Sequence, residues 1–387
     1  MNIEVRKPTR PDEALHPRRF RWGMQEVSGA LGDLGTFLPH IIGAITVVGM
    51  APAGIFVTFG LFYALGGAFY GLPIAVQPMK AASAVVLIEP MEPGAIAAAG
   101  LVLGAFFLLV GVTGLVERIA RIVPDTVAAG LQLGLGLALA GLGLKLLRND
   151  PWLALAICGV ILAFLTSRVF PAAIAALVVG AAAGQLLGTA PPFPAIEIGL
   201  HLPLLIVPTW AQFVHGLENA VLPQIPLTLT NAIIVTAAVS RQLFPNGAER
   251  VTERNLSVTT GLGNLLAAPF GGYPMCHGAG GVTGHYRFGA RTATAPVLIG
   301  VIFVLLGLLL GDAGYALLKT IPDAVLGAML LFSGIDLAQS SKPQRFKDAD
   351  LFLVLLLAAI GVALNPAVAF AVGVPMAYAL RRGWLRV

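Results

Sequence analysis

The chain has 387 residues, of which 57% are hydrophobic and only 11% are charged, and its formal net charge at pH 7 is +5. Because a soluble globular domain carries about 25% charged residues, this composition excludes an ordinary water-soluble fold. A net charge this small gives no indication of nucleic-acid binding. The two cysteines, Cys158 and Cys276, lie in apolar stretches and predict no disulfide framework.

Residues 1–23 are polar and basic, and no signal-peptide cleavage site follows them, so we expect a cytoplasmic N-terminal segment. Fourteen apolar segments come next, most of them close to the roughly 20 residues that a bilayer-spanning helix needs. The chain is therefore predicted to be an all-α integral membrane protein with fourteen transmembrane spans. The predicted spans are residues 24–48, 52–71, 73–88, 94–116, 124–146, 152–169, 171–189, 222–243, 252–269, 276–286, 291–311, 313–338, 349–364 and 366–382.

The spans divide into two sets of seven, at residues 24–189 and 222–382. Residues 190–221 between them are first Pro-rich and then mixed in polarity, and we expect an external loop and an amphipathic helix at the membrane interface. A short cytoplasmic tail, residues 383–387, is predicted to end the chain without a soluble regulatory domain.

Two short patterns recur in both halves. PDTV at residues 124–127 is followed 198 positions later by PDAV at 322–325, and FYGLP at 69–73 is followed 201 positions later by FGGYP at 270–274. Both pairs connect a span with the seventh span after it, and because seven is odd, the second copy is predicted to be inverted in the membrane. Inverted repeats with interrupted helices are typical of secondary transporters.

The basic residues give the predicted orientation. With the N-terminus inside, Lys145, Arg148 and Lys319 fall on the outer side, Lys80 falls within a span, and all other Lys and Arg residues fall on the inner side. This asymmetry follows the positive-inside rule. It predicts that both termini are cytoplasmic and that the protein lies in the cytoplasmic membrane.

The third and tenth predicted spans are short, and each follows a Gly- and Pro-rich stretch. We expect half-helices there, whose N-termini would each offer free N–H groups and about half a positive charge to an anion. Pro78 suits a first helical position, and Gly278 and Gly280 would let an oxyanion approach the backbone closely. Two proline kinks with tight packing are the structural alternative.

Lys80 is the one basic residue predicted inside a span, where it costs roughly 2.5–3.5 kcal/mol on insertion scales. We expect it to face a cavity, with Asp33 in the first span as its partner or as a proton carrier. Snorkelling or a structural ion pair is the alternative for Lys80, and a structural hydrogen-bond hub is the alternative for Asp33.

The eighth span carries uncharged hydrogen-bonding groups at Gln224, Thr228 and Asn231, which would contact an anion or pack against other helices. Cys276 and His277 are adjacent but lack a second pair of zinc ligands, so no metal site is predicted. We expect these two residues to form a polar wall or a proton-sensitive group beside a substrate.

AVQPMKA at residues 75–81 and FGGYPMCHGAGG at 270–281, followed by YRFGART at 286–292, resemble signatures of the molybdate transporters within the sulfate permease superfamily. QIPLTLTN at residues 224–231 is similar to that family's eighth span, and the resemblance covers nearly the whole chain. It implies a seven-plus-seven inverted repeat with core and gate domains, in which spans one, three, eight and ten surround the anion.

The resemblance further implies uptake of molybdate, with the nearly isosteric tungstate as a second substrate and with no cofactor. Because a dianion that enters a negatively charged cell moves uphill, either protons or another cation must travel with it, or trapping inside the cell must pull the flux. Our hypothesis is proton symport, with Asp33, Glu26 and His277 as candidate carriers. The lipid bilayer surrounds the protein, and the oligomeric state stays open, a homodimer included. The predicted substrate-binding residues are Gln77, Pro78, Met79, Lys80, Gln224, Thr228, Asn231, Cys276, His277, Gly278, Ala279 and Gly280.

Other functions of the same architecture stay open at this point, namely sulfate or bicarbonate transport, an uncoupled anion channel, and a nucleobase permease. Nucleobase carriers often place carboxylates in the eighth and tenth spans, where this chain has Asn231 and a Gly-rich stretch, and this difference favours an anion. Asn231 also stands where many sulfate permeases carry a carboxylate, which argues against cation coupling at this position. No Ser-His-Asp, HExxH or paired-carboxylate pattern indicates an enzyme.

Overall fold

The computed structural model describes residues 19–89, 91–122, 124–167, 170–195, 198–364 and 366–384. Most of the predicted segment 1–23 and the last three residues of the predicted tail therefore lie outside the described residues. The elements of the first half are α1 (Met24–Ala30), η2 (Leu31–Asp33), α2 (Leu34–Thr46), α3 (Pro52–Tyr70), β1 (Val76–Pro78), α4 (Lys80–Ile88), α5 (Pro93–Thr113), α6 (Val116–Ile122), α7 (Asp125–Leu147), α8 (Pro151–Phe164) and α9 (Ala172–Leu186).

The second half repeats much of this order. Its elements are α10 (Trp210–Gly216), η3 (Leu217–Val221), α11 (Leu222–Leu227), η4 (Thr228–Val235), α12 (Thr236–Leu243), α13 (Glu253–Ala267), η5 (Ala268–Phe270), β2 (Met275–His277), α14 (Ala279–Arg287), α15 (Thr294–Leu318), α16 (Asp323–Ser340), η6 (Pro343–Arg345), α17 (Asp348–Ala363) and α18 (Pro366–Arg381).

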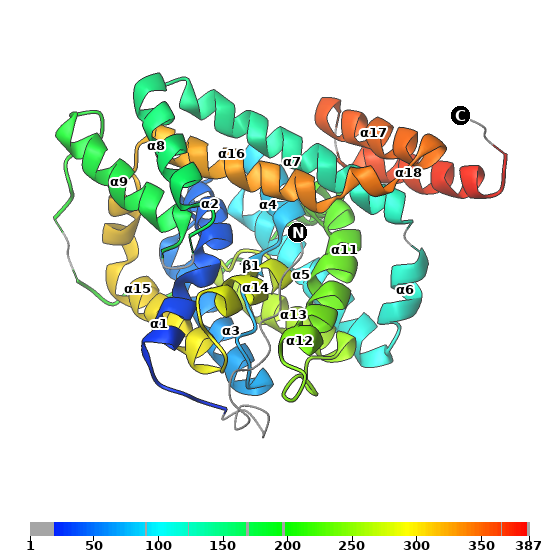
Figure 1. The fold of residues 1–387 in the computed structure, drawn as a ribbon, viewed down its shortest axis with the longest axis horizontal. Coiled ribbons are helices and arrows are strands. Elements are labelled where there is room, and N and C mark those ends of the chain that lie inside the picture. The colour runs from blue at the N-terminus through cyan, green and yellow to red at the C-terminus, as the bar shows by residue number, and fades with distance from the viewer. Residues whose placement is uncertain are drawn as a thin grey trace.

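The helices pack as two groups. In the first group, α7 packs against α16, α17 and α18, and α8 packs against α9 and α16; α7, α16, α17 and α18 lie across the top of Figure 1. In the second group, α3 packs against α15 and α13 packs against α5. Helix α2 connects the groups, because it contacts α9 and α16 of the first group and α15 of the second. Helix α4 contacts α7 of the first group.

Glycines allow the main helix pairs to approach closely. A Cβ atom built at Gly136 of α7 would lie 2.7 Å from the carbonyl oxygen of Gly334 in α16, and one built at Gly334 would lie 2.6 Å from the carbonyl oxygen of Gly136. Gly60 and Gly300 face each other in the same way between α3 and α15, at 2.5 and 2.6 Å. Small residues at such contacts let membrane helices pack backbone to backbone.

The recurring sequence patterns occupy corresponding places in the two halves. Helices α4 and α14 have nine residues each, each begins two residues after a three-residue strand, and their starts are 199 positions apart. The helical turns before the strands end at Gly71 and Gly271, with φ angles of 73° and 72°. Helices α7 and α16 each begin after an extended proline, Pro124 and Pro322.

The connection between the halves differs from the prediction. We expected a loop and a separate interfacial helix within residues 190–221, but one continuous helical stretch runs over Trp210–Leu243. A capping box fixes its start. The Thr209 hydroxyl accepts from the backbone N–H of Gln212 at 3.3 Å, and the side-chain carbonyl oxygen of Gln212 accepts from the backbone N–H of Thr209 at 2.9 Å. This reciprocal pairing satisfies two N–H groups at once.

The predicted boundary at residues 311–313 coincides with a kink, because the stretch long and apolar enough to cross a membrane, Thr294–Gly311, ends there. Helix α15 continues through a kink at Gly311, whose φ of 26° and ψ of −109° are not helical, and ends at Leu318. The next helix begins only after Pro322. Glycine adopts positive φ at little cost, so the break falls at a residue that can adopt it. The predicted span 313–338 is instead divided, between the last turns of α15 and the whole of α16.

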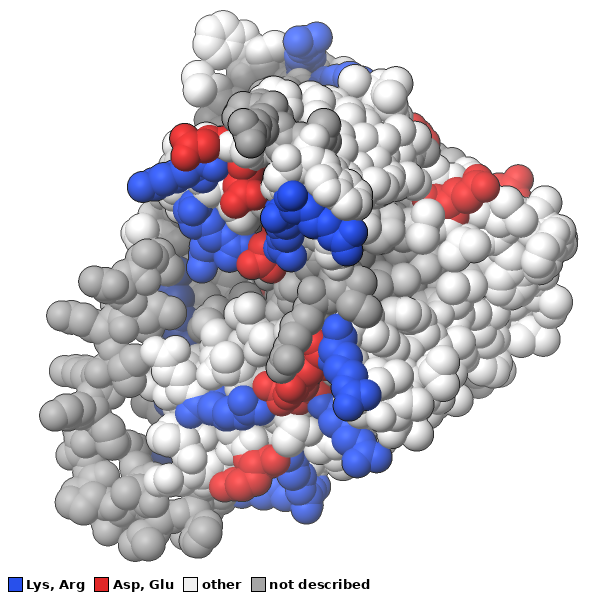
Figure 2. Space-filling view, turned by 90° about the vertical axis from the view of Figure 1, so that its right-hand side faces the viewer, with Lys and Arg blue, Asp and Glu red and all other residues white. Residues whose placement is uncertain are grey.

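Six helical stretches in the described part of the chain are long and apolar enough to cross a membrane, and three shorter apolar helices accompany them. Figure 2 shows charged side chains of both signs gathered on one part of a face, next to a broad uncharged surface. Large apolar side chains such as Leu109, Leu155 and Leu355 are more than half exposed, as lipid-facing residues are. The protein is therefore a multi-pass helical membrane protein, and the count of fourteen spans stays a prediction.

Candidate functional site

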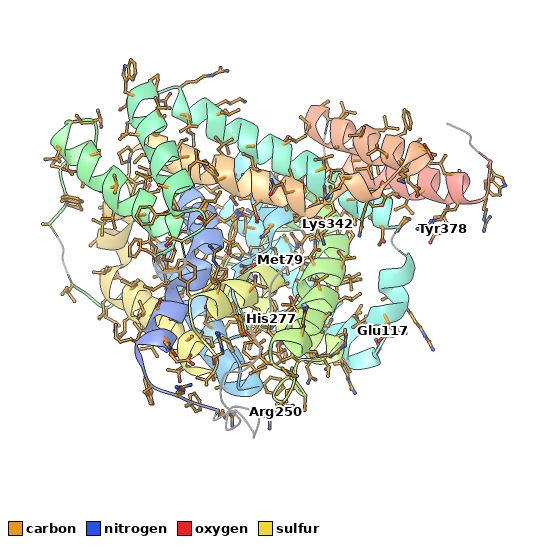
Figure 3. The ribbon with its side chains drawn as sticks, in the orientation of Figure 1. Met79, Glu117, Arg250, His277, Lys342 and Tyr378 are labelled. Atoms are coloured by element: carbon orange, nitrogen blue, oxygen red, sulfur yellow. The ribbon has the colours of Figure 1, made fainter. Side chains whose placement is uncertain are left out.

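Ten of the twelve residues predicted to bind substrate line one cavity of about 850 Å³. Both helix groups contribute to its wall. Met79 and Thr228 are fully buried beneath this surface. Figure 3 places Met79 and His277 near the centre of the molecule and Lys342, another lining residue, at the end of α16. The ten lining residues are Gln77, Pro78, Lys80, Gln224, Asn231, Cys276, His277, Gly278, Ala279 and Gly280.

The strands β1 and β2 form the centre of this wall. They pair antiparallel, with Gln77 opposite Cys276. Directly after the strands, α4 begins at Lys80 and α14 begins at Ala279, and both of these residues line the cavity. The first N–H groups of a helix have no partner within it, so two helix N-termini with their partial positive charges face the same cavity.

Gln77 is held from behind by Asp33. The buried Asp33 carboxylate accepts hydrogen bonds from the Tyr63 hydroxyl at 2.5 Å, from the Thr36 hydroxyl at 2.6 Å, and from the Gln77 amide. The Gln77 amide nitrogen also donates to the Thr36 hydroxyl at 2.5 Å. Because both acceptors require an N–H, the orientation of the amide is fixed. Asp33 thus forms a hydrogen-bond hub behind the strands, as one of its two interpretations expects, and its role as a proton carrier stays a prediction.

Gln224 caps helix α4 from the second half. Its side-chain carbonyl oxygen accepts from the backbone N–H of Ala82 at 2.9 Å, and its side-chain amide nitrogen donates to the Thr228 hydroxyl at 2.7 Å. Ala82 lies in the first turn of α4, where N–H groups need partners from outside the helix. Gln224 therefore both lines the cavity and fixes the end of α4, while Thr228 supports Gln224.

Lys80 does not pair with Asp33, so this expectation was wrong. Its ammonium group lies 3.6 Å from a carboxylate oxygen of Asp336 in α16, and both residues line the cavity. Asp33 points toward the three donors behind the strands and has no cation among the partners named above. The sequence could not give this distance, because it carries no information on which of two intramembrane carboxylates lies nearer.

The side chain of His277 is completely buried and bonded at both ring nitrogens. Nδ1 lies 3.0 Å from the Ala75 carbonyl oxygen, so it carries the proton, and Nε2 lies 2.8 Å from the Thr259 hydroxyl. The Thr259 hydroxyl is also 2.7 Å from the Tyr70 hydroxyl. The ring therefore connects the cavity wall to α3 and α13.

Asn231 reaches across to the other helix group. Its side-chain amide nitrogen donates to the side-chain carbonyl oxygen of Gln132 in α7 at 3.3 Å. The side-chain amide nitrogen of Gln132 donates in turn to the Ser340 hydroxyl of α16. Gln132 and Ser340 line the cavity and were not predicted. Asp336 was missed as well, although a carboxylate inside the predicted span 313–338 is a signal of function.

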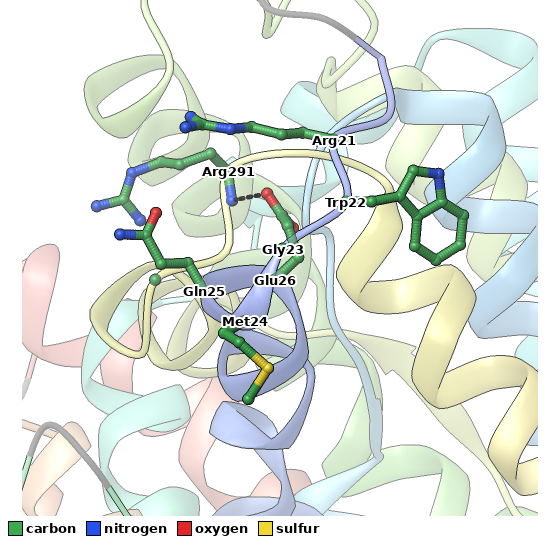
Figure 4. Close-up of a pocket in the computed structure, with 8 residues that line it drawn as sticks. Arg21, Trp22, Gly23, Met24, Gln25, Glu26 and Arg291 are labelled. Carbon is green, nitrogen blue, oxygen red and sulfur yellow. Dashed lines mark hydrogen bonds between the residues drawn. The ribbon is translucent and has the colours of Figure 1, made fainter.

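Glu26 lies elsewhere. It lines a separate cavity of about 270 Å³ together with Arg21, Trp22 and Arg291, and its carboxylate accepts from the Arg291 backbone N–H at 2.9 Å, as Figure 4 shows. The structure therefore does not place this coupling candidate among the residues that line the large cavity.

The architecture is shared with solved structures of membrane transporters. The transmembrane domain of the cyanobacterial bicarbonate transporter BicA superimposes with a TM-score of 0.67 at 21% identity, over 90% of this chain and 97% of that one. SLC26A9 superimposes with a TM-score of 0.68 at 14% identity, over 92% of this chain and 65% of that one. The fold and the central cavity thus define a helical membrane protein of the SLC26 and BicA architecture.

The sequence gives the family. The family described as "Molybdate transporter of MFS superfamily" matches residues 25–139 and 216–337, which include both signature stretches. Molybdate transporter 1 of Arabidopsis thaliana is 31% identical over 92% of this chain and 87% of its own length, and Molybdate transporter 2 of the same plant is 32% identical over 87% and 82%. The chain belongs to the molybdate transporter family, and the predicted resemblance is confirmed.

Proposed function

We propose that this protein imports molybdate, and also tungstate, across the cytoplasmic membrane as a secondary active transporter. One observation carries the proposal, namely that the starts of α4 and α14 and the ammonium group of Lys80 line the same cavity. Backbone N–H groups at helix N-termini bind oxyanions. Membership of the molybdate transporter family supports molybdate as the particular oxyanion.

In the proposed bound state, the oxyanion lies between the N-termini of α4 and α14, which act as two half-helices. Gly278, Ala279 and Gly280 offer N–H groups with little side-chain bulk, Lys80 supplies positive charge, and Gln224 contributes through its amide. The remaining predicted residues act around this contact: Gln77, Pro78, Met79, Thr228, Asn231, Cys276 and His277.

The proposed topology has fourteen spans with both termini cytoplasmic. The spans of residues 24–189 and 222–382 form an inverted repeat, which the corresponding positions of α4 and α14 support. The helix group of α7–α9 and α16–α18 acts as the gate domain, and the other group acts as the core. Alternating access then consists of movement of the core against the gate.

Transport against the membrane potential requires a source of energy. Two negative charges cost about 4.6 kcal/mol to import against 100 mV, at about 2.3 kcal/mol per charge. We propose proton symport, with Asp33, Glu26 and His277 as the candidate carriers. Uptake into proteoliposomes at equal rate and to equal accumulation with and without a proton gradient would contradict symport.

The first experiment is equilibrium binding of molybdate to the purified protein, with sulfate, tungstate and uracil as competitors. We expect binding that tungstate displaces and that excess sulfate and uracil do not, and weaker binding in Lys80→Ala. Displacement by sulfate would favour a general oxyanion transporter. Displacement by uracil, or absence of molybdate binding, would overturn the proposal in favour of a permease of the same fold.

A further inference from the structure

The ion pair between Lys80 and Asp336 stands at the point where the proposed substrate binds. Lys80 opens α4, one of the two helices whose N-termini face the cavity, and its ammonium group lies 3.6 Å from the Asp336 carboxylate. The side chains are open to the cavity, with 26% of the Lys80 surface and 63% of the Asp336 surface exposed. An ion that enters the cavity can therefore reach both groups.

A second polar link joins the same two helices close to the ion pair. His40 of α2 lies between Ser83 and Ser333, with ring nitrogen to hydroxyl distances of 2.8 and 3.0 Å. Ser83 follows Lys80 by three positions in α4, and Ser333 precedes Asp336 by three positions in α16. Three positions are about one helical turn, so the ion pair and the histidine link form a ladder between α4 and α16.

Two other carboxylates of the cavity have basic partners of their own. Asp125 lies 3.8 Å from Arg345, and Glu253 lies 2.7 Å from Arg241. These two pairs share no residue with the ladder. Lys80 is the lining cation that opens one of the two helices, and Asp336 is the anion that holds it.

An oxyanion bound at the start of α4 needs the same cation. A dianion close to Lys80 would also lie close to Asp336, and like charges a few ångströms apart repel each other. Building on the proposed function, we propose that Asp336 occupies Lys80 in the empty site and that the incoming oxyanion displaces it. Substrate binding then breaks the ion pair between α4 and α16 and frees the two helix groups to move against each other.

Asp336→Asn tests this exchange, because it keeps the shape and removes the charge. We expect molybdate to bind at least about 5-fold more tightly than to the wild type, the lower end of usual coupling between two ligands. Asp125→Asn is the matched control, since it removes a carboxylate from the same cavity that is paired with Arg345. Its effect on affinity should be clearly smaller.

Three further measurements make the result decisive. In the Lys80→Ala background, Asp336→Asn should tighten binding less than it does in the wild type, because the cation for which the two anions compete is gone and only their mutual repulsion is relieved. In proteoliposomes, Asp336→Asn should lower the half-saturating molybdate concentration and the maximal rate together, since the substrate leaves more slowly. Asp336→Ser, checked by thermal unfolding, serves as a second variant if Asp336→Asn does not fold.

The possible failures are distinguishable. A wild-type protein that binds no molybdate overturns the proposed function and this inference with it. A wild type that binds, together with an Asp336→Asn variant that binds no more tightly than Asp125→Asn, overturns the exchange alone. Weaker binding in Asp336→Asn would also overturn it, because Asp336 would then position Lys80 for the substrate instead of competing with it.

Discussion

Gly280 offers a test of direct contact between the oxyanion and the start of α14. This glycine is the second residue of the helix and lines the cavity, and a Cβ atom built on it meets no atom within 4 Å. Gly280→Ala should therefore fold normally and gain up to about 1 kcal/mol of helix stability. The new methyl group would, however, stand in the space through which the anion approaches the N–H groups.

The expected loss follows from the hydrogen bonds at stake. Preventing one hydrogen bond to a charged group costs about 1.5 to 3 kcal/mol, which is about a 10- to 150-fold loss of affinity. Thermal unfolding in detergent and equilibrium molybdate binding measure the two effects separately. Gly141→Ala in α7 is the control, because Gly141 also has open space around its Cβ position and is not a lining residue. Unchanged affinity in Gly280→Ala would refute anion binding at this helix end.

Three other substitutions probe the support of the cavity wall. Gln224→Ala leaves the Ala82 N–H without its acceptor, so unfolding should become easier by about 1 to 3 kcal/mol, and thermal unfolding at or above the wild-type temperature would contradict this. Asp33→Asn replaces a carboxylate that accepts three hydrogen bonds with an amide, which donates on one side and accepts on the other. We expect a lower unfolding temperature together with weaker molybdate binding, and a change in neither would show that the hub is dispensable. Gly278→Ala brings a Cβ atom to 1.9 Å from the side-chain carbonyl oxygen of Gln77. In contrast to Gly280→Ala, this variant should therefore lose both stability and molybdate binding. A stable, fully binding protein would rule out this packing.

Composition and local patterns were sufficient to predict much of the fold. Glycine and proline mark the places where helices stop, because their backbone preferences act locally, and both interruptions before α4 and α14 were found in this way. The strands were not found, because the pairing of Gln77 with Cys276 joins residues from opposite halves and leaves no trace in either local sequence.

The misassigned contacts have a similar cause. The sequence indicates an acidic partner for Lys80 in the membrane, but Asp33 and Asp336 are both acidic residues within predicted spans. Only the packing decides that Asp33 lies behind β1, among three donors, and that Asp336 faces the cavity.

The helix that begins at Trp210, earlier than the predicted span, was missed for a local reason. Thr209 and the glutamine three positions later form a capping pair, and the Pro-rich chain before them obscured this signal.

The correspondence between the halves leads to a last prediction, because the two helix starts are alike in backbone and unlike in charge. Lys80 opens α4 and Ala279 opens α14, 199 positions later, and both line the cavity. If the oxyanion lies between the two ends, a cation at either one should serve it.

The variant Lys80→Ala combined with Ala279→Lys should therefore recover part of the molybdate affinity that Lys80→Ala loses, about 10-fold if one charge-assisted contact of about 1.4 kcal/mol returns. Combining Lys80→Ala with Thr230→Lys is the control, since Thr230 lines the same cavity but does not open a helix. Equal recovery in both would mean that only the net charge of the cavity matters. Recovery in neither would mean that the anion contacts the first half alone, because a lysine at the start of α14 would then be too far away to help. Recovery restricted to Ala279→Lys would instead require an anion held by both helix starts. Position 279 opens α14 as Lys80 opens α4, whereas position 230 lies within a helical stretch.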